Sequence, residues 1–172
     1  LTIGFVSGMY VANESMITSA NEGVTKYKQE DGHFELKKQA DATLLSAIET
    51  GEKADFKATK TTLYENFFRN EEEDYNNDGK KDGTIRVFAK TKDINLACML
   101  QGSFPQKADE IAIDRMHADN VGIKVGDTVT VSGETYKVVG LLAYANYSTL
   151  HEKTTDLMFD ALKFDVAMVT QD

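Results

Sequence analysis

The most clearly patterned part of this chain is NVGIKVGDTVTVSGETYKVVGLL, residues 120–142. Two segments of it alternate apolar with polar residues, and Ser132 and Gly133 stand between them. Alternation with a period of two is typical of a strand with one buried face, and a short connection containing glycine is typical of a tight hairpin. We therefore expect a β-hairpin whose apolar face carries Val125, Val129 and Val131.

Composition limits the classes of protein to consider. The chain has 172 residues, of which 41% are hydrophobic, which is enough for one domain with a core of its own, or for one domain with a small lobe. Its formal net charge of −9 would repel phosphates, so we expect no nucleic-acid partner. Cys98 is the single cysteine, and the histidines His33, His117 and His151 do not follow a metal-ligand spacing. We therefore expect no disulfide framework and no metal site.

The first 30 residues carry a helical pattern. Apolar or aromatic side chains recur at steps of three and four, which predicts a helix of about seven turns: Val6, Tyr10, Ile17, Ala20, Val24 and Tyr27, with Asn13 in the same row. No charge precedes Glu14, and polarity rises after it, as at the outer end of a membrane-spanning helix. Gly4 and Gly8 have a spacing found where membrane helices touch. An amphipathic helix packed on its own domain explains the pattern equally well.

Strand-like segments outnumber helical ones in the rest of the chain. The strand-like segments are 32–37, 54–68, 83–91, 94–102, 109–114 and 164–170. Short helices are expected at 41–50, where Asp41 is the N-cap and Gly51 the stop, and at 115–122, which Gly122 ends. This pattern favours the α+β class, with a mixed, mainly antiparallel sheet, a long N-terminal stalk helix and short helices.

Residues 74–82, DYNNDGKKD, partly match a calcium-binding loop. Oxygen-bearing side chains occupy positions 1, 3, 5 and 9 of such a loop: Asp74, Asn76, Asp78 and Asp82. Gly79 stands at the turn position, but position 12 is Ile85 instead of glutamate, and Lys80 and Lys81 add positive charge. The alternative is a polar hairpin tip. We expect a turn that binds calcium weakly or not at all, and we interpret the preceding acidic residues 71–73 as a solvated strand edge.

The sequence contains no motif that assigns catalysis. The patterns G-x-S-x-G, H-E-x-x-H, G-x-G-x-x-G and the P-loop do not occur, and Gly122 and Gly126 are interpreted as a helix stop and a turn residue. Carboxylates are numerous, but nothing in the sequence pairs two of them in a cleft. We therefore assign no catalytic, cofactor-binding or metal-binding residue, expect no cofactor, and predict that the chain is not an enzyme.

Residues 109–142 resemble the extracytoplasmic, MacB-like core domain of FtsX-like ABC transporter permeases. In that family a strand of the type nEIvI precedes a short helix and then the pattern lGlkvGDtv.v.g..ykVvGiv. The corresponding elements here are 110–113, 115–120 and 121–142, and Gly102 and Pro105 match the turn that precedes them. The segment FDVAMVT, 164–170, is similar to the family's strand after the hairpin. The resemblance covers most of the chain, and residues 102–142 are its specific part.

The pattern GlkvGDtv also occurs in small β-barrels, including molybdopterin-enzyme and decarboxylase-type domains. The apolar helix ahead of a mixed domain favours the permease. The resemblance then implies that residues 1–30 are the outward end of a membrane helix and its stalk, and that 31–172 form the extracytoplasmic core domain. It implies a position in the cell membrane with the domain on the extracytoplasmic face, where a return helix would follow the core domain.

The function implied by this resemblance is mechanical. The domain would couple ATP-driven motion of the membrane helices to a substrate or partner outside the membrane, and the ATPase would be a separate cytoplasmic subunit. A second permease copy or an extracellular protein would be a further partner. Two alternatives stay open. One is a free-standing surface or lipoprotein binding module, with calcium at 74–82, and the other is an enzyme domain on the same small barrel.

Overall fold

A computed structural model describes residues 14–18, 20–36, 38–50, 62–153 and 155–170. The chain divides into two units, residues 30–66 and residues 1–29 with 67–172. In the smaller unit, helix α2 (Ala42–Thr50) begins after Asp41, whose Oδ1 accepts a hydrogen bond from the backbone N of Leu44 at 2.8 Å. The predicted N-cap is therefore confirmed, whereas the stop at Gly51 lies outside the described residues. The described residues of the strand expected at 32–37 are not in a strand.

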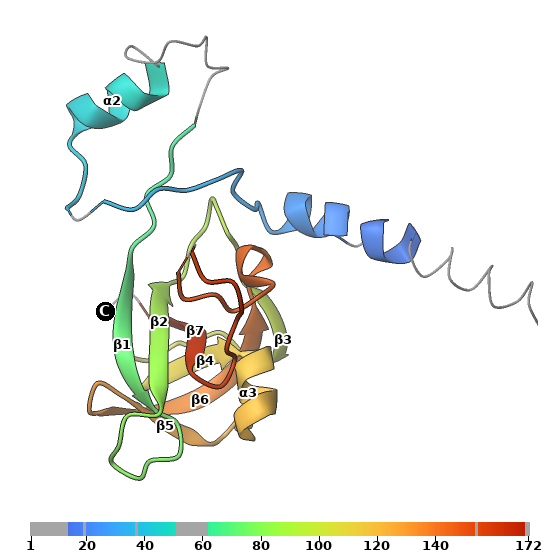
Figure 1. Ribbon diagram of the computed structural model, residues 1–172, viewed down its shortest axis with the longest axis vertical. Coiled ribbons are helices and arrows are strands. Elements are labelled where there is room, and N and C mark those ends of the chain that lie inside the picture. The colour runs from blue at the N-terminus through green and yellow to red at the C-terminus, as the bar shows by residue number, and fades with distance from the viewer. Residues whose placement is uncertain (1–13, 19, 37, 51–61, 154, 171–172) are drawn as a thin grey trace, which may run out of the picture. The chain divides into compact units, whose positions relative to one another are not determined.

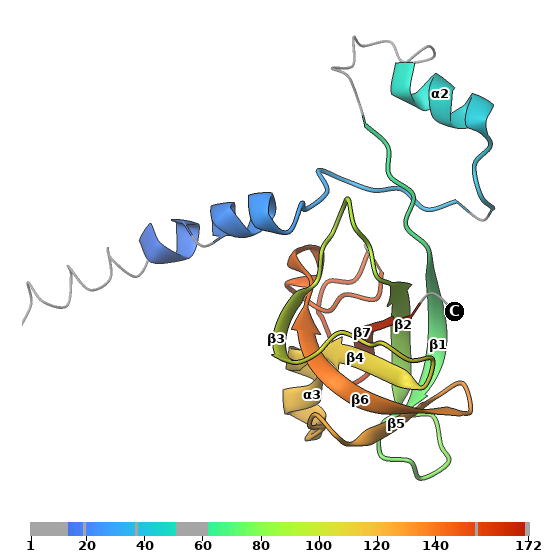
Figure 2. The same ribbon diagram turned by 180° about the vertical axis from the view of Figure 1, so that it is seen from behind.

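The described residues of the larger unit form seven strands: β1 (Phe68–Asp74), β2 (Gly83–Ala89), β3 (Cys98–Gly102), β4 (Glu110–Asp114), β5 (Thr128–Val131), β6 (Glu134–Ala143) and β7 (Phe164–Val169). They are hydrogen-bonded in the order β3-β6-β4-β7-β2-β1-β5, and β5 also pairs with β6. This last pairing closes a six-stranded barrel, with β3 added on the outside of β6 (Figures 1 and 2). Helix α3 (Arg115–Val121) follows β4, and the short 3-10 helix η1 (Ala145–Tyr147) follows β6.

The expected α+β sheet with a long stalk helix is therefore wrong. Among the described strands, β2–β7 and β4–β6 pair in parallel and the other neighbours are antiparallel, but the sheet closes on itself instead of staying open. The physical reason is the length of β6, which pairs with β5 through 134–137, with β4 through 137–142 and with β3 through 140–143. A strand with partners on both sides along staggered parts of its length curls the sheet until its edges meet.

A glycine marks the place where β6 changes its partners. The register between β4 and β6 shifts between Ile111 and Ala112, and Val139 is skipped. A Cβ on Gly140 would overlap the carbonyl oxygen of Ser103, and a Cβ on Gly102 would overlap that of Val139. Such close backbone approach accepts only glycine at both positions.

Two apolar clusters fill the barrel unit. One draws on β2, β4, β5, β6 and β7 and lies inside the barrel, with Ile85, Ile111, Ile113, Val129, Val138 and Ala167 among its members. The other lies on the opposite face of β2, β4 and β7 and includes Phe88, Ala112, Leu142, Val166 and Met168. Strands β4 and β7 are therefore buried on both faces, since the chain between β6 and β7 covers their outer side with Tyr144, Leu150 and Ala161.

The hairpin predicted within residues 120–142 and the short helix predicted at 115–122 are both confirmed. Strands β5 and β6 meet at Val131 and Glu134, and the turn residues Ser132 and Gly133 have φ values of 48° and 85°. Val129 and Val131 are buried and Thr128 is exposed, which confirms the predicted alternation. Helix α3 ends at Gly122 in the left-handed conformation, as expected. The strands expected at 83–91, 94–102, 109–114 and 164–170 are also present, as β2, β3, β4 and β7.

The N-terminal segment departs from the expectation. The described helical residues before the barrel are 14–18 and 20–26, and the helix ends where Lys28 takes a φ of 49°. They form no long stalk helix, and the first 13 residues of the predicted stalk lie outside the described part of the chain. None of the described helices combines the length and the apolar character needed to cross a membrane. Of the strand expected at 54–68, residues 54–61 are not described, and β1 begins only at Phe68.

Candidate functional site

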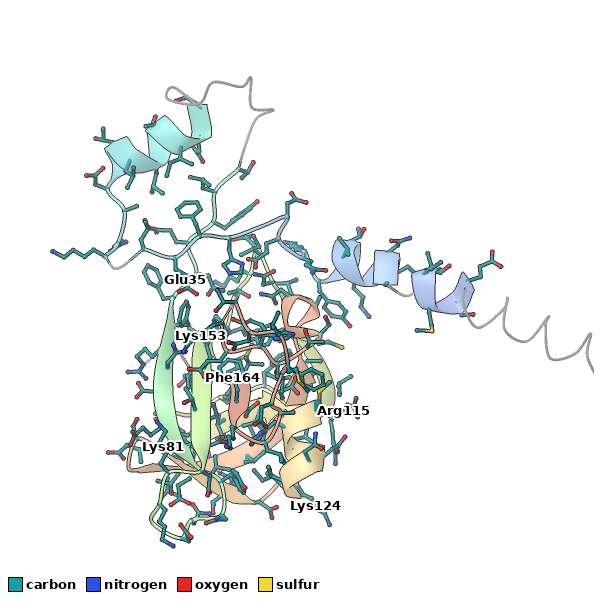
Figure 3. The ribbon with its side chains drawn as sticks, in the orientation of Figure 1. Glu35, Lys81, Arg115, Lys124, Lys153 and Phe164 are labelled. Carbon is teal, nitrogen blue, oxygen red and sulfur yellow. The ribbon has the colours of Figure 1, made fainter. Side chains whose placement is uncertain are left out.

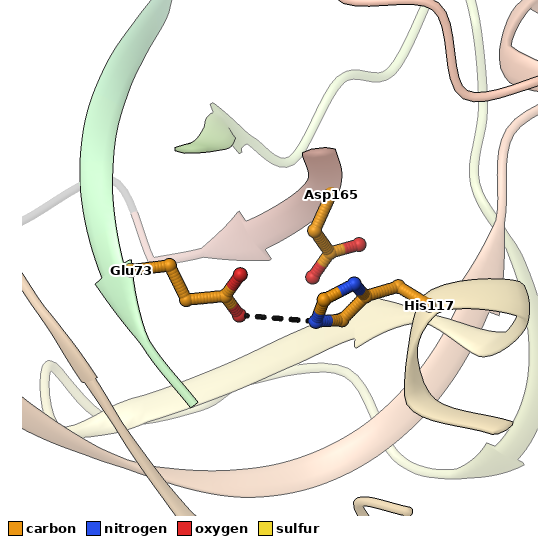
Figure 4. A group of neighbouring side chains, drawn as sticks. All are labelled: Glu73, His117 and Asp165. Atoms are coloured by element: carbon orange, nitrogen blue, oxygen red, sulfur yellow. Dashed lines mark ion pairs between the residues drawn. The ribbon is translucent and has the colours of Figure 1, made fainter. Parts of the chain in front are cut away.

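Three ionisable side chains meet inside the barrel (Figure 4). Glu73 comes from the end of β1, His117 from α3 and Asp165 from β7, and each is 0% exposed. Glu73 stands where β1 pairs with both β2 and β5, opposite Gly83 and Val131. Its position in the closed barrel therefore turns its side chain away from water.

Helix α3 directs His117 into this cluster. The helix begins immediately after β4, and Oδ1 of Asp114 caps it by accepting hydrogen bonds from the backbone N of Met116 at 2.7 Å and of His117 at 3.3 Å. The Asp165 carboxylate is held by two hydrogen bonds, since its Oδ1 accepts from the backbone N of Asp114 at 3.2 Å and of Val166 at 2.6 Å. The N-cap thus fixes the backbone from which His117 extends, and two backbone N–H groups fix the carboxylate of Asp165.

The two ring nitrogens of His117 have different neighbours. Nδ1 lies 2.7 Å from the carbonyl oxygen of Ala161, which only accepts hydrogen bonds, so Nδ1 carries a hydrogen. Nε2 points at Oε1 of Glu73, 3.4 Å away (Figure 4). The ring of Tyr75 packs edge-on against the imidazole, with centroids 5.7 Å apart. The imidazole is therefore oriented by a backbone carbonyl on one side and presents Nε2 to the carboxylates on the other.

Several polar atoms of the cluster are buried without a hydrogen bond. In the described part of the chain these include Nε2 of His117, both carboxylate oxygens of Glu73 and Oδ2 of Asp165. The ligand atoms of the three side chains lie within 4.8 Å of one another. A buried polar atom that lacks a partner costs about 1–3 kcal/mol, and a buried charge costs more. The cluster therefore needs a positive species at its centre, either a proton or a cation.

Burial and mutual charge shift the pKa values of these groups. Burial lowers the pKa of His117, but the neighbouring carboxylates of Asp165 and Glu73 outweigh it and raise the pKa to about 9. Burial raises the pKa of Asp165 well above its usual range, against the opposing effect of His117. Burial also raises the pKa of Asp114, although its two backbone hydrogen bonds act the other way. Without a cation, these shifts favour the protonated forms of His117 and Asp165.

The loop between β1 and β2 is a hairpin tip, as predicted from its turn residues. Asp74 accepts hydrogen bonds from the backbone N of Asp78 at 3.1 Å and of Gly79 at 2.8 Å, and Gly79 has a φ of 83°. Lys81 extends from this loop and pairs with Glu72 at 3.3 Å (Figure 3). The Asp74 carboxylate is thus already engaged by backbone donors, and weak or absent calcium binding at 74–82 stays a prediction.

The sequence does not indicate that Glu73, His117 and Asp165 lie together, as they do in the fold. Of the histidines, His33 contacts Glu30 at 2.8 Å in the smaller unit, and His151 packs against Phe159, so only His117 among the three joins the cluster. The interpretation of residues 71–73 as a solvated edge is wrong for Glu73, which is fully buried. Two signals pointed to the site. They were a single Asp165 inside the apolar segment 164–169 and a histidine one turn after a strand end.

A second feature of the barrel unit is the junction between the N-terminal helix and the chain leading into β3. The carbonyl oxygens of Tyr27 and Lys28 accept hydrogen bonds from the backbone N of Leu96 at 2.8 Å and of Asn95 at 3.0 Å. The Tyr27 hydroxyl donates to Sγ of Cys98, the first residue of β3, at 2.8 Å. The helix end is therefore joined to a barrel strand by backbone as well as side-chain contacts.

No protein-family description matches this chain, and no curated protein and no solved structure matches it either.

Proposed function

We propose that this chain is the extracytoplasmic domain of an FtsX-like ABC transporter permease subunit, which passes ATP-driven motion of membrane helices to a substrate or partner outside the membrane. The ATPase would be a separate cytoplasmic subunit, and the domain itself would carry out no chemistry. The proposal rests on the resemblance of residues 102–142 and on one structural observation, the junction between the N-terminal helix and β3.

The junction is suited to carrying force. Hydrogen bonds from Asn95 and Leu96 hold two consecutive carbonyl groups at the end of the helix, and Lys28 Nζ also donates to the carbonyl oxygen of Lys92 at 3.1 Å. Two adjacent backbone hydrogen bonds prevent the helix end from rotating and from sliding relative to residues 95–96, whereas a single side-chain contact would leave it free to rotate. A displacement of the helix end is therefore passed to the segment that enters β3.

A force applied to β3 would move the barrel as a rigid body. Strand β3 pairs with β6 through 140–143, and β6 is the strand that also joins β4 and β5. A closed barrel with a packed interior deforms less than an open sheet, because every strand in it has two neighbours. Transmission by a stiff element that changes position between two states is an established way of coupling distant sites.

The test uses the parent protein in its membrane, together with its ATPase. A spin label on Thr128→Cys, in a Cys98→Ser background, reports the distance from the barrel to the bilayer surface, because Thr128 is exposed on β5. We expect this distance to change when ATP binds the complex. Insertion of two glycines after Ile17, within the described helix, should abolish the change, because glycine pairs break helices.

The matched control is the same two-glycine insertion after Lys80, at the exposed tip of the β1–β2 hairpin, which should leave the ATP-dependent change intact. Recovery of the parent protein in the soluble fraction, without an ATPase, would contradict the proposal and favour the free-standing binding module. A distance that does not respond to ATP, or that responds equally after the insertion at Ile17, would also contradict it.

A further inference from the structure

We propose that Glu73, His117 and Asp165 bind one divalent transition-metal ion inside the barrel, and that zinc is the ion that this ligand set takes. The inference concerns the interior of the barrel and does not depend on the proposed function. It departs from the sequence-based expectation of no metal site, because the three residues come from β1, α3 and β7 and have no common spacing.

The orientation of His117 favours metal binding through Nε2. Its Nδ1 hydrogen is committed to the carbonyl oxygen of Ala161 at 2.7 Å, so a neutral imidazole carries its lone pair on Nε2. That lone pair would face Oε1 of Glu73 at 3.4 Å, where two acceptors repel each other. An imidazole whose Nδ1–H is held by a backbone carbonyl is the usual arrangement of a metal-ligating histidine, because the hydrogen bond fixes the tautomer and raises the basicity of Nε2.

The three donor groups and the distances between them suit a zinc ion. One imidazole nitrogen and two carboxylates are ligands that zinc accepts, at bond lengths of about 2.0–2.2 Å in a tetrahedral arrangement. Tetrahedral ligands at this distance stand about 3.4 Å apart, which is the separation of Nε2 of His117 from Oε1 of Glu73. The ligand atoms of all three residues lie within 4.8 Å of one another, so a shift of no more than about 1.4 Å brings the most distant pair to this tetrahedral spacing.

In the described part of the chain, several polar atoms of the cluster have no hydrogen bond. Oδ1 of Asp165 is occupied by the backbone N of Asp114 and of Val166, whereas its Oδ2 lacks a hydrogen bond in the described part of the chain, as do both oxygens of Glu73 and Nε2 of His117. All three side chains are 0% exposed, so these atoms do not face the solvent. Each side chain therefore has at least one ligand atom without a hydrogen bond.

The charge of the cluster also favours a divalent cation. A neutral His117 with two carboxylates carries a charge of −2, which a divalent cation neutralises completely. A proton on His117 neutralises only half of it, and a second proton on Glu73 or Asp165 is then required in a fully buried place. Hard cations such as Mg²⁺ and Ca²⁺ prefer six or more oxygen ligands, so a small site with an imidazole favours zinc over both.

Complete burial indicates a structural rather than a catalytic role for the ion. It would join the end of β1, the first turn of α3 and the start of β7, three segments that are far apart in the sequence. A structural metal couples its binding free energy to folding, so the ion would enter before the barrel closes. The experiment therefore loads the metal during refolding.

The full chain, without a histidine tag, is unfolded in denaturant with chelator and refolded either with Zn²⁺ or with EDTA. After removal of free metal, we expect elemental analysis to find about one zinc per chain and the zinc-refolded protein to melt at a higher temperature. The near-isosteric variants Glu73→Gln, His117→Gln and Asp165→Asn should each lower the zinc affinity at least tenfold. Glu72→Gln and His151→Gln are the matched controls and should retain zinc, because Glu72 is exposed and His151 packs against Phe159.

A second measurement uses only the wild-type protein and therefore tests the proposal even if the variants do not fold. Wild-type protein refolded with Co²⁺ should show the visible absorption of a tetrahedral cobalt ion with nitrogen and oxygen ligands, and Zn²⁺ should displace it, whereas equal Mg²⁺ or Ca²⁺ should not. Wild-type protein that retains no zinc and melts at the same temperature in Zn²⁺ and in EDTA would overturn the proposal. Zinc retained equally by His117→Gln would overturn it too, because the metal would then lie elsewhere.

Discussion

Truncation of Val129 to alanine tests whether the hairpin of residues 120–142 closes the barrel through its apolar face. Val129 is 0% exposed in the interior cluster and pairs with Tyr136 across β5 and β6. Its neighbour Thr128 is exposed on the same strand and pairs with Lys137. The two positions share backbone, strand and turn, and they differ in the face of the sheet on which the side chain lies.

The magnitude follows from burial. Replacing valine by alanine removes the equivalent of two buried methylene groups, at about 0.8 kcal/mol each, and the cavity left among rigid strands adds to this. We expect Val129→Ala to lower the free energy of unfolding by about 2–3 kcal/mol, or the melting temperature by about 4–12 °C for a chain of this size. Thr128→Ala should cost no more than about 1 kcal/mol, through the lost strand preference of threonine.

The assay is urea unfolding of the full chain followed by far-ultraviolet circular dichroism, with the slope of the transition compared between variants. An unchanged slope with a lower midpoint would show that the native barrel itself has lost stability. If Val129→Ala and Thr128→Ala cost the same, the two faces of β5 would not differ in burial. The closure of the barrel by β5 would then be wrong.

Three further predictions concern the surroundings of the site and the loop. Asp114→Ala removes the N-cap that accepts from Met116 and His117, and should lower the free energy of unfolding by about 1–2 kcal/mol in urea titrations, with Asp114→Asn costing less. With a chelator present, only protons can neutralise the cluster. Because folding raises the pKa of His117 from 6.5 to about 9, protonated His117 stabilises the folded chain fully below pH 6.5, and this stabilisation is lost as the pH rises through about 9. Stability of the metal-free chain should therefore fall across this range, and a flat profile equal to that of His117→Gln would contradict the assignment. Millimolar Ca²⁺ should not raise the melting temperature through the loop 74–82, and a rise abolished by Asp78→Ala would reverse this prediction.

Local features of the fold were predictable because their causes lie within a few residues. The β5–β6 hairpin depends on alternation and on Ser132 and Gly133 at a turn that needs positive φ. Helix α3 depends on the cap Asp114 and on the left-handed Gly122. Neither requires knowledge of a distant partner.

The closure of the sheet was not predictable in this way. An open sheet and a barrel show the same alternation, because the period of two reports only which face is buried. The difference lies in long-range pairings, above all β1 with β5 and β2 with β7, which join residues more than 50 positions apart. Strands β4 and β7 are buried on both faces, so their continuous apolar segments show no alternation to follow.

The hairpin, the short helix with its caps, and the acidic character of the chain all follow from local sequence. That Glu73, His117 and Asp165 share one buried space follows from the tertiary structure alone. The physical reason is that a charged residue in a strand looks the same in the sequence whether its side chain faces water or the interior. Which face is inside depends on the closure of the barrel, and that closure is a property of the whole set of strands.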